Sequence, residues 1–405
     1  MRVSTLSALA LSAPWAASLV AASIGGAGYD TSRVGPSNAD CTRTTYQLAI
    51  ESNTTAFDAS YTSNINEDYV IGSLTSSSAA NFSNHYETGA RTNRVARTYN
   101  ISGTLCTPKG GAANASHVHY WDFVVGDAEE YSYVRASAAA GISTFRYDRL
   151  GTGLSEKPAD SYNFNTNLAA MASVVQSSTD LAIAQKLLTM LRSGGIGGRK
   201  FAKVVGVGHS YGSLQMQALS ATLPAALDGI VLQGFSVNAT AQPLLLTGGA
   251  YSIATQVFPA RFAPAELTNG YLVTGLPQTN QLGFFHYPGY AQAAFARARA
   301  TEQPVSQAVL FTQGALVRPA PDFKGPVHVV TGDKDFIFCL GNCYAVPRRS
   351  AHASVLDGVA ALYPAARKFS TYLPADTGHA TNQHLSAPAT FREMLAFVEG
   401  VLADA

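Results

Sequence analysis

The sequence predicts an α/β fold in which helices cover both faces of a mostly parallel, doubly wound sheet. Strand-like runs alternate with helical runs after residue 128, which is the chain order of a parallel sheet. At residues 208–212 an apolar run ends in a serine between glycines, as at a sharp turn from a strand into a helix. Residues 237–325 interrupt the alternation, which indicates an inserted cap.

The first part of the chain predicts an antiparallel extension of this sheet. Residues 41–105 are rich in Thr, Ser, Asn and Tyr and contain runs typical of strands, such as TYQLAIES and ARTYNISGTLC. A helix is then expected at 131–141, a strand at 142–147, and a helix within 167–191, where apolar residues recur at helical spacing.

The second part predicts the rest of the sheet. Strands are expected at 201–208, 229–235, 325–332 and 368–374, and helices at 213–223, 354–364 and 387–404. Around the cap, residues 23–236 and 326–405 are therefore expected to form the two parts of one α/β domain. The cap itself, 237–325, is rich in aromatic residues and proline and has helical pieces, as in AQAAFARARA.

The N-terminus predicts export. Residues 1–22 combine Arg2, a short apolar stretch interrupted by Pro14, and small residues at 20–22, which is the pattern of a cleaved signal peptide rather than of a membrane anchor. We therefore expect a secreted, extracellular protein. Glycosylation sequons agree with this location and occur at Asn53, Asn81, Asn100, Asn114 and Asn238.

Four cysteines predict two disulfides, which an oxidising compartment would allow. A Cys41–Cys106 bond would tie the ends of the antiparallel region together, the alternative being two buried thiols. A Cys339–Cys343 bond would close a tight loop. The spacing of the second pair is also compatible with metal ligands, but no further Cys/His pair lies nearby, so we expect no metal.

The charge balance excludes several classes of partner. The chain has 27 basic and 26 acidic residues, which provides no electrostatic surface for nucleic acid. No later segment has the uninterrupted apolar length of a membrane span, so stable membrane insertion is not expected. The expected partner is a small, mostly uncharged molecule.

Ser210 is the candidate nucleophile. It stands in Gly208-His209-Ser210-Tyr211-Gly212, between a predicted strand and a predicted helix. A nucleophile elbow requires this setting, with small residues on both sides of a sharp bend. A serine hydroxyl also needs a base to take its proton and an acid to orient the base.

His379 is the candidate base, because it follows the last predicted strand on a loop that should reach the same sheet edge. His384 is a weaker candidate, inside or capping the next helix. Asp335 is the candidate acid, with Asp333 in reserve, because both follow the strand at 325–332. Asp376 is interpreted as a turn former.

These residues resemble the α/β-hydrolase superfamily, and more narrowly secreted fungal hydrolases of the serine esterase and lipase type. The motifs YWDF, YSYVRA, YDRLGTG and GHSYG occur in that family's order, and the resemblance covers about residues 95–400. It implies Ser210 as nucleophile, Asp335 as acid, His379 as base and the Tyr211 amide as one oxyanion donor. It also implies a structural turn at 148–153, no cofactor, and a substrate-selecting lid at 237–325.

One departure from the family concerns the second oxyanion donor. The family has an apolar strand ending in His-Gly before YWDF, whereas this chain has only GGAANASHVHYWDF. In the favoured interpretation the strand is compressed or lost, and a hole with a single donor could lower turnover by about 100-fold or more. Alternatively HVHYWDFVVG is itself the strand, with Gly126 near the oxyanion loop. A misread gene boundary would leave the same gap.

The predicted function is a secreted serine hydrolase that cleaves a carboxylic ester or lactone with a small apolar acyl group. One alternative is a peptidase or acyl transferase that tailors a natural product with the same triad. The other is a binding protein whose oxyanion hole is incomplete. Comparing esters with aminoacyl amides separates the first two functions, and covalent labelling of Ser210 separates both from the third.

Overall fold

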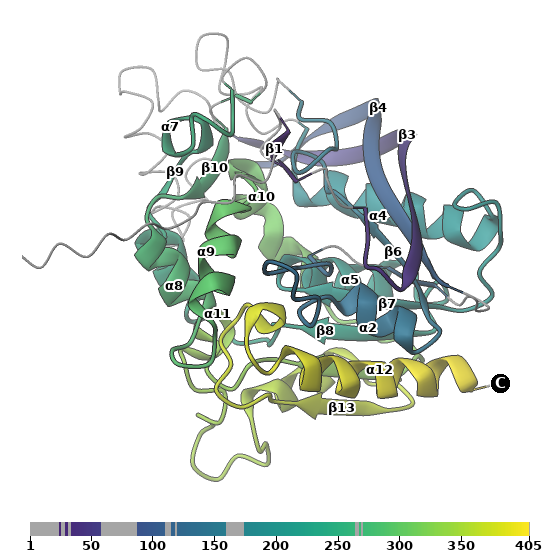
Figure 1. Ribbon diagram of the computed structural model, residues 1–405, viewed down its shortest axis with the longest axis vertical. Coiled ribbons are helices and arrows are strands. Elements are labelled where there is room, and N and C mark those ends of the chain that lie inside the picture. Colours follow the sequence, from purple (N-terminus) through teal and green to yellow (C-terminus); the bar gives the residue numbers. More distant parts are fainter. Residues whose placement is uncertain are drawn as a thin grey trace, which may run out of the picture.

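A computed structural model describes residues 24–25, 29–30, 34–57, 87–109, 115–117, 120–158, 174–263, 267–268 and 270–404 (Figure 1). The predicted signal peptide, residues 1–22, and the sequon residues Asn81 and Asn114 lie outside these ranges.

The described residues form one eight-stranded sheet, in the order β13-β12-β8-β7-β5-β6-β4-β3. The strands from β5 and β6 through to β13 run parallel, and β4 pairs antiparallel with both β6 and β3. This arrangement confirms the predicted fold class. The strand bounds are β3 Ala39–Phe57, β4 Glu87–Pro108, β5 Ala115–His117, β6 Ser143–Tyr147, β7 Val204–His209, β8 Gly229–Gln233, β12 Val327–Val330 and β13 Phe369–Tyr372. A separate antiparallel pair is formed by β1 Ile24–Gly25 and β2 Tyr29–Asp30.

Helices cover both faces of the parallel strands because successive strand residues point to opposite faces. Val205 and Val207 pack into the core beneath α2 (Tyr133–Ala139) and α12 (Ala387–Ala403). Val204 packs into the opposite core, with side chains of α4 (Ser177–Ser193) and α5 (Tyr211–Thr222). Figure 1 shows α12 lying along the sheet on the side of α2. The apolar run of β7 is therefore buried on both faces, as a central parallel strand requires.

The antiparallel extension is the long ribbon of β3 and β4. Cys41 on β3 lies opposite Cys106 on β4, and the two form a disulfide. Because Cys106 also lies in the part of β4 that pairs with β6, the bond joins the edge strand β3 to the sheet at this point.

β5 occupies the place where the sequence departs from the family pattern. It lies between β6 and β7 and is parallel to both, although it has only three residues. The strand is therefore compressed, in agreement with the favoured interpretation, and it is not lost. The alternative in which HVHYWDFVVG forms the strand is wrong, because Trp121–Gly126 takes part only in isolated bridges between Asp122 and Ser132 and between Val125 and Ala128.

The insertion between β8 and β12 contains strands as well as helices. Its elements are α6 Gln242–Gly248, β9 Tyr251–Ile253, α7 Ala254–Val257, β10 Tyr271–Thr274, α8 Pro277–Phe284, α9 Gln292–Ala300, β11 Val305–Ser306, α10 Gln307–Thr312 and the 3₁₀ helix η4 Gln313–Leu316. The strands form an antiparallel sheet in the order β11-β10-β9. In Figure 1 the elements α7 to α10 gather at one side of the molecule, away from the C-terminal end of α12. The limits 237 and 325 stay a prediction.

Two short segments differ from the sequence-based expectation. The helix expected at 354–364 is the 3₁₀ helix η5, Val355–Leu362, and a further 3₁₀ turn, η6, covers Thr381–Gln383. In the part of the chain described here, no helix combines the length and apolar character needed to cross a membrane.

His328 is a buried histidine within β12 that the sequence analysis did not single out. Its Nδ1 lies 2.8 Å from Oγ of Ser370 on β13, and its ring stacks on Phe397 of α12 with centroids 5.1 Å apart. Burial lowers the pKa of His328 to about 4, which the Ser370 contact opposes and Lys368 assists. The folded state therefore favours the neutral ring.

Replacing His328 with glutamine is expected to make stability less sensitive to acid. An unfolded histidine binds its proton near pH 6.5, while the folded one resists protonation down to about 4. The wild type thus loses up to about 1.4 kcal/mol of stability per pH unit at this site as the pH falls through that window. The stability gap between wild type and His328→Gln should shrink accordingly in urea denaturation at pH 7 and pH 4.5. A gap that stays constant would contradict the assignment.

Candidate functional site

Ser210 lies at the bend between β7 and α5. Its backbone angles, φ 52° and ψ −119°, are unusual for a residue other than glycine. The Ser210 amide donates to the Gln233 carbonyl of β8 at 2.8 Å, so the end of the neighbouring strand holds the bend in place. Backbone strain of this kind is characteristic of a residue whose position is functionally constrained.

The two glycines around Ser210 have different importance. A Cβ atom at Gly208 would lie 2.3 Å from the Gly212 carbonyl oxygen, which is a severe clash. At Gly212 a Cβ would meet no described atom within 4 Å. The expectation that both positions must be small was therefore wrong for position 212. The backbone of Gly212, and not its Cα hydrogen, is what approaches Gly208 of the strand.

Tyr211 begins α5, where backbone amides have no acceptor within the helix. Its side chain is held by one residue of α4 and one residue of the turn after β6. The phenol donates to Oδ2 of Asp180 at 3.0 Å, and the Arg149 guanidinium, itself 3.0 Å from the same oxygen, lies over the Tyr211 ring. The sequence analysis placed Arg149 only within the structural turn at 148–153, and it missed Asp180, since no local pattern marks a helix residue that contacts a distant turn.

Asp335 and His379 form a fully buried pair. Asp335 Oδ2 accepts the Nδ1–H of His379 at 2.7 Å, and neither side chain is exposed. The second carboxylate oxygen, Oδ1, accepts the Phe338 amide at 2.9 Å, since Asp335 caps the short helix α11, Phe336–Cys339. Both oxygens are therefore engaged, which fixes the carboxylate against the histidine.

The reserve carboxylate at the same turn has other partners. Asp333 accepts the Thr377 amide at 3.1 Å and pairs with Lys334. Asp376 adopts a positive φ of 51°, as a turn residue does. The disulfide Cys339–Cys343 closes the loop after Asp335, and the Gly341 amide within that loop donates to the Asp335 carbonyl. The structure thus brings Asp335, rather than Asp333, to His379.

His209 connects the elbow to the loop that carries His379, a role that the sequence analysis did not predict. Its Nε2 lies 2.8 Å from the His379 carbonyl oxygen, so Nε2 carries the proton and donates it. Burial lowers the pKa of His209 to about 3, with His379 nearby acting in the same direction. The neutral side chain of His209, the residue before Ser210, therefore binds directly to the backbone of His379.

The His379 ring is enclosed mainly by other rings. The centroids of His209, Phe284 and Phe338 lie 4.8, 5.6 and 5.7 Å from that of His379. Its Nε2 atom is buried and has no hydrogen-bond partner among the described residues. Among the described residues the structure therefore places no hydrogen bond between this nitrogen and Ser210 Oγ.

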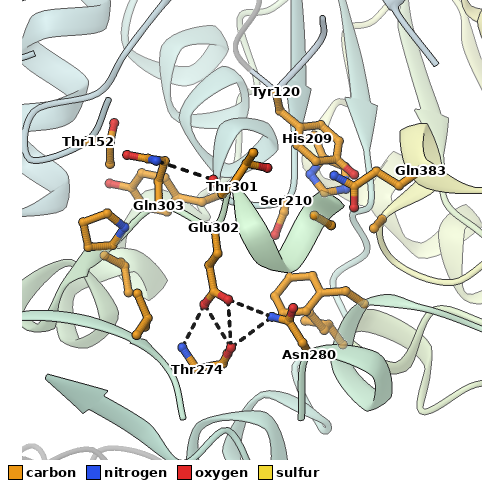
Figure 2. Close-up of a pocket in the computed structure, with 18 of the residues that line it drawn as sticks. Tyr120, Thr152, His209, Ser210, Thr274, Asn280, Thr301, Glu302, Gln303 and Gln383 are labelled. Carbon is orange, nitrogen blue, oxygen red and sulfur yellow. Dashed lines mark hydrogen bonds between the residues drawn. The ribbon is translucent and has the colours of Figure 1, made fainter. Parts of the chain in front are cut away.

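A cavity of about 530 Å³ opens beside Ser210 and extends under the insertion, a volume typical of a site for a small organic molecule. Its apolar wall includes Leu214, Leu245, Leu246, Phe284, Ile337 and Phe338. Figure 2 shows Ser210 and His209 on one side of this cavity and Thr152 and Gln303 on the other.

The insertion contributes one polar network to the cavity wall (Figure 2). The Glu302 carboxylate accepts the amide and hydroxyl of Thr274 at 2.8 and 2.9 Å, accepts an Asn280 N–H at 3.3 Å, and pairs with Arg299. These contacts join β10, α8 and the end of α9, so the network holds the insertion together. No residue of this network had been predicted.

The fold also bears on the metal and glycan sites that the sequence raised. No group of three or more His, Cys, Asp or Glu side chains in the described ranges is placed to hold a metal ion. Of the sequon residues described, Asn53 and Asn100 are exposed on the β3–β4 ribbon and Asn238 is half-buried at the start of the insertion. Glycosylation at these positions stays a prediction.

Three of the solved structures similar to this chain have low sequence identity to it. A bromoperoxidase from Bacillus anthracis is 16% identical with a TM-score of 0.45, over 75% of this chain and 96% of that one. A lipase in an open form is 15% identical with a TM-score of 0.47, over 76% and 96%. A monoacylglycerol lipase of Paleococcus ferrophilus is 16% identical with a TM-score of 0.43, over 73% and 96%. Comparison with curated protein sequences found no significant match. The profile of the α/β hydrolase family matches residues 110–394, and the chain belongs to that family.

Proposed function

We propose that this α/β hydrolase is a secreted serine hydrolase that cleaves a carboxylic ester or lactone. The observation that carries the proposal is the buried Asp335–His379 pair, whose Nε2 has no partner among the described residues and whose ring lies against that of His209, the residue before Ser210. Its N-terminal signal pattern and two disulfides support secretion.

In the proposed reaction Ser210 Oγ attacks the ester carbonyl carbon while His379 Nε2 takes the hydroxyl proton. Asp335 holds the ring in the tautomer that leaves Nε2 free to accept. The Tyr211 amide, at the N-terminal end of α5, stabilises the oxyanion. The hydrogen bond from the Tyr211 phenol to Asp180 keeps Tyr211 in place. His379 then gives the proton to the leaving alcohol, and water releases the acyl group by the same steps in reverse.

The cavity supports an ester or lactone over a peptide terminus. Much of its wall is apolar, and its two carboxylates, Asp122 and Glu302, are each paired with an arginine, Arg146 and Arg299. Neither is therefore placed to hold the amino group of a peptide substrate. An uncharged acyl group matches this lining better.

A fluorophosphonate probe tests the proposal directly. The wild type should be labelled covalently on Ser210, as peptide mass spectrometry would show, and Ser210→Ala should not be labelled. The probe needs an activated serine but no knowledge of the substrate. A folded wild type without label on Ser210 would contradict the proposal and favour the alternative of a binding protein with an incomplete oxyanion hole.

A further inference from the structure

His384 is a fully buried histidine that the proposed reaction does not use. Its Nδ1 lies 2.9 Å from the Ala380 carbonyl oxygen, so Nδ1 carries the ring proton. Its Nε2 then has a lone pair, which accepts two backbone N–H groups, from His286 at 3.1 Å and from Gly378 at 3.0 Å. Every polar atom of the ring is thus engaged.

The two N–H groups belong to different parts of the fold. His286 follows α8 in the insertion, whereas Gly378 directly precedes His379. Two further backbone bonds run between the same segments: the Ala380 amide donates to the Phe284 carbonyl, and the Leu385 amide to the Gly289 carbonyl, both at 2.8 Å. Segment 284–289 of the insertion and loop 378–385 are therefore joined around the His384 ring.

We call this connection between segment 284–289 and loop 378–385 the joint. Close packing at the joint leaves the two backbones little freedom to move. A Cβ on Gly289 would lie 1.7 Å from the Asp376 carbonyl oxygen, and one on Gly378 would lie 2.8 Å from the His286 nitrogen. The His384 ring stacks on Phe285 with centroids 5.5 Å apart and meets Tyr290 edge-on. The two backbones approach each other too closely to slide independently.

The joint reaches the proposed base through Phe284. This side chain lies at the start of the joined segment, lines the cavity and contacts the His379 ring. A shift of segment 284–289 would therefore change both the cavity wall and the packing that orients His379.

We propose that His384 is a positioning residue that joins the insertion to the loop of His379, so that the cavity wall and the His379 ring keep a common geometry. Its effect on turnover rests on the function proposed above. The joint itself does not, and it can be measured separately.

The charge state of His384 suits this role. Burial lowers its pKa to about 4; His286 and His379 also lower it, while the Ala380 carbonyl and Asp335 oppose them. The ring therefore stays neutral at ordinary pH and keeps the lone pair that both N–H groups need. A proton on Nε2 would face two donors and break the joint.

The test compares His384→Ala and His384→Gln with the matched control His328→Gln, which alters another buried histidine, in β12. Hydrogen–deuterium exchange of peptides spanning 284–290 and 378–386, the rate of fluorophosphonate labelling, and kcat and KM for a short acyl ester are measured at pH 7.

In His384→Ala both peptides should exchange faster together. Labelling and kcat should fall roughly 10- to 100-fold, as expected for a misplaced catalytic geometry. In His384→Gln the amide oxygen can accept the two N–H groups, so most of the exchange protection and at least a third of kcat should return. His328→Gln should lower stability while leaving exchange in both peptides and kcat unchanged.

The proposal is overturned if His384→Ala leaves exchange of 284–290 unchanged. It is also overturned if glutamine restores neither protection nor kcat, since His384 would then be only one more core residue. A wild type that shows no label and no turnover removes the proposed function, while the exchange of the two peptides still decides whether the joint exists.

Discussion

Replacing Ser210 with alanine is expected to lower kcat for short acyl esters by roughly 10⁴- to 10⁶-fold, the range seen when a serine hydrolase loses its nucleophile. In the proposed reaction the hydroxyl supplies the oxygen that forms the acyl-enzyme. KM should change little, because the hydroxyl adds little to binding an apolar acyl group. Steady-state kinetics with p-nitrophenyl esters would measure both constants.

The fold of the Ser210→Ala variant should remain intact. The backbone strain at the bend is imposed by the Gly208–Gly212 approach and the Gln233 contact, which alanine leaves in place. Circular dichroism and thermal unfolding should match the wild type. Hydrolysis by the variant within tenfold of the wild-type rate would show that another group performs the reaction.

The Asp335→Asn variant is expected to lower kcat by about 10⁴-fold. The new amide N–H would face His379 Nδ1 in place of the carboxylate oxygen that now lies 2.7 Å away. The imidazole would then carry its proton on Nε2, the atom that accepts the proton of Ser210 in the proposed reaction. The kcat should fall at every pH at which the wild type is active, with a smaller effect on KM.

Asp333→Asn provides the matched control for this loss. It makes the same chemical change in the same turn, but Asp333 contacts the Thr377 amide and Lys334 rather than His379. Its main effect should be on thermal stability, with kcat within about tenfold of the wild type. Equal losses of kcat in the two variants would contradict the assignment of Asp335 as the orienting acid.

Local patterns were sufficient to predict the sheet, its order of strands and helices, and the turn at Ser210. The apolar run of β7 and the helix that follows it are recognised from residues close together in sequence. The glycine at 208 belongs to the same short stretch. The same holds for the Cys41–Cys106 pair, because the two cysteines lie near the ends of a recognisable antiparallel region. The order of Ser210, Asp335 and His379 along the chain follows from the order of the strands that precede them.

The sequence analysis expected a compressed or lost strand before Tyr120, but it could not locate the short strand β5 at residues 115–117. Three residues cannot display a period of two, and β5 is defined by the hydrogen bonds it makes to β6 and β7 on either side. Residues 115–117 are identified as a strand by their pairing with β6 and β7. No property of these three residues alone identifies them.

The sequence by itself therefore determined the fold, the elbow and a short set of candidate partners for Ser210. Only the tertiary structure decided which carboxylate meets His379, and that His209 and His384 form hydrogen bonds with backbone atoms of the loop that carries His379. It also decided that Asp180 and Arg149 contact Tyr211. The physical reason is that strand and helix periodicity is local, whereas the direction of a side chain in a turn depends on distant backbone groups that the rest of the fold brings against it.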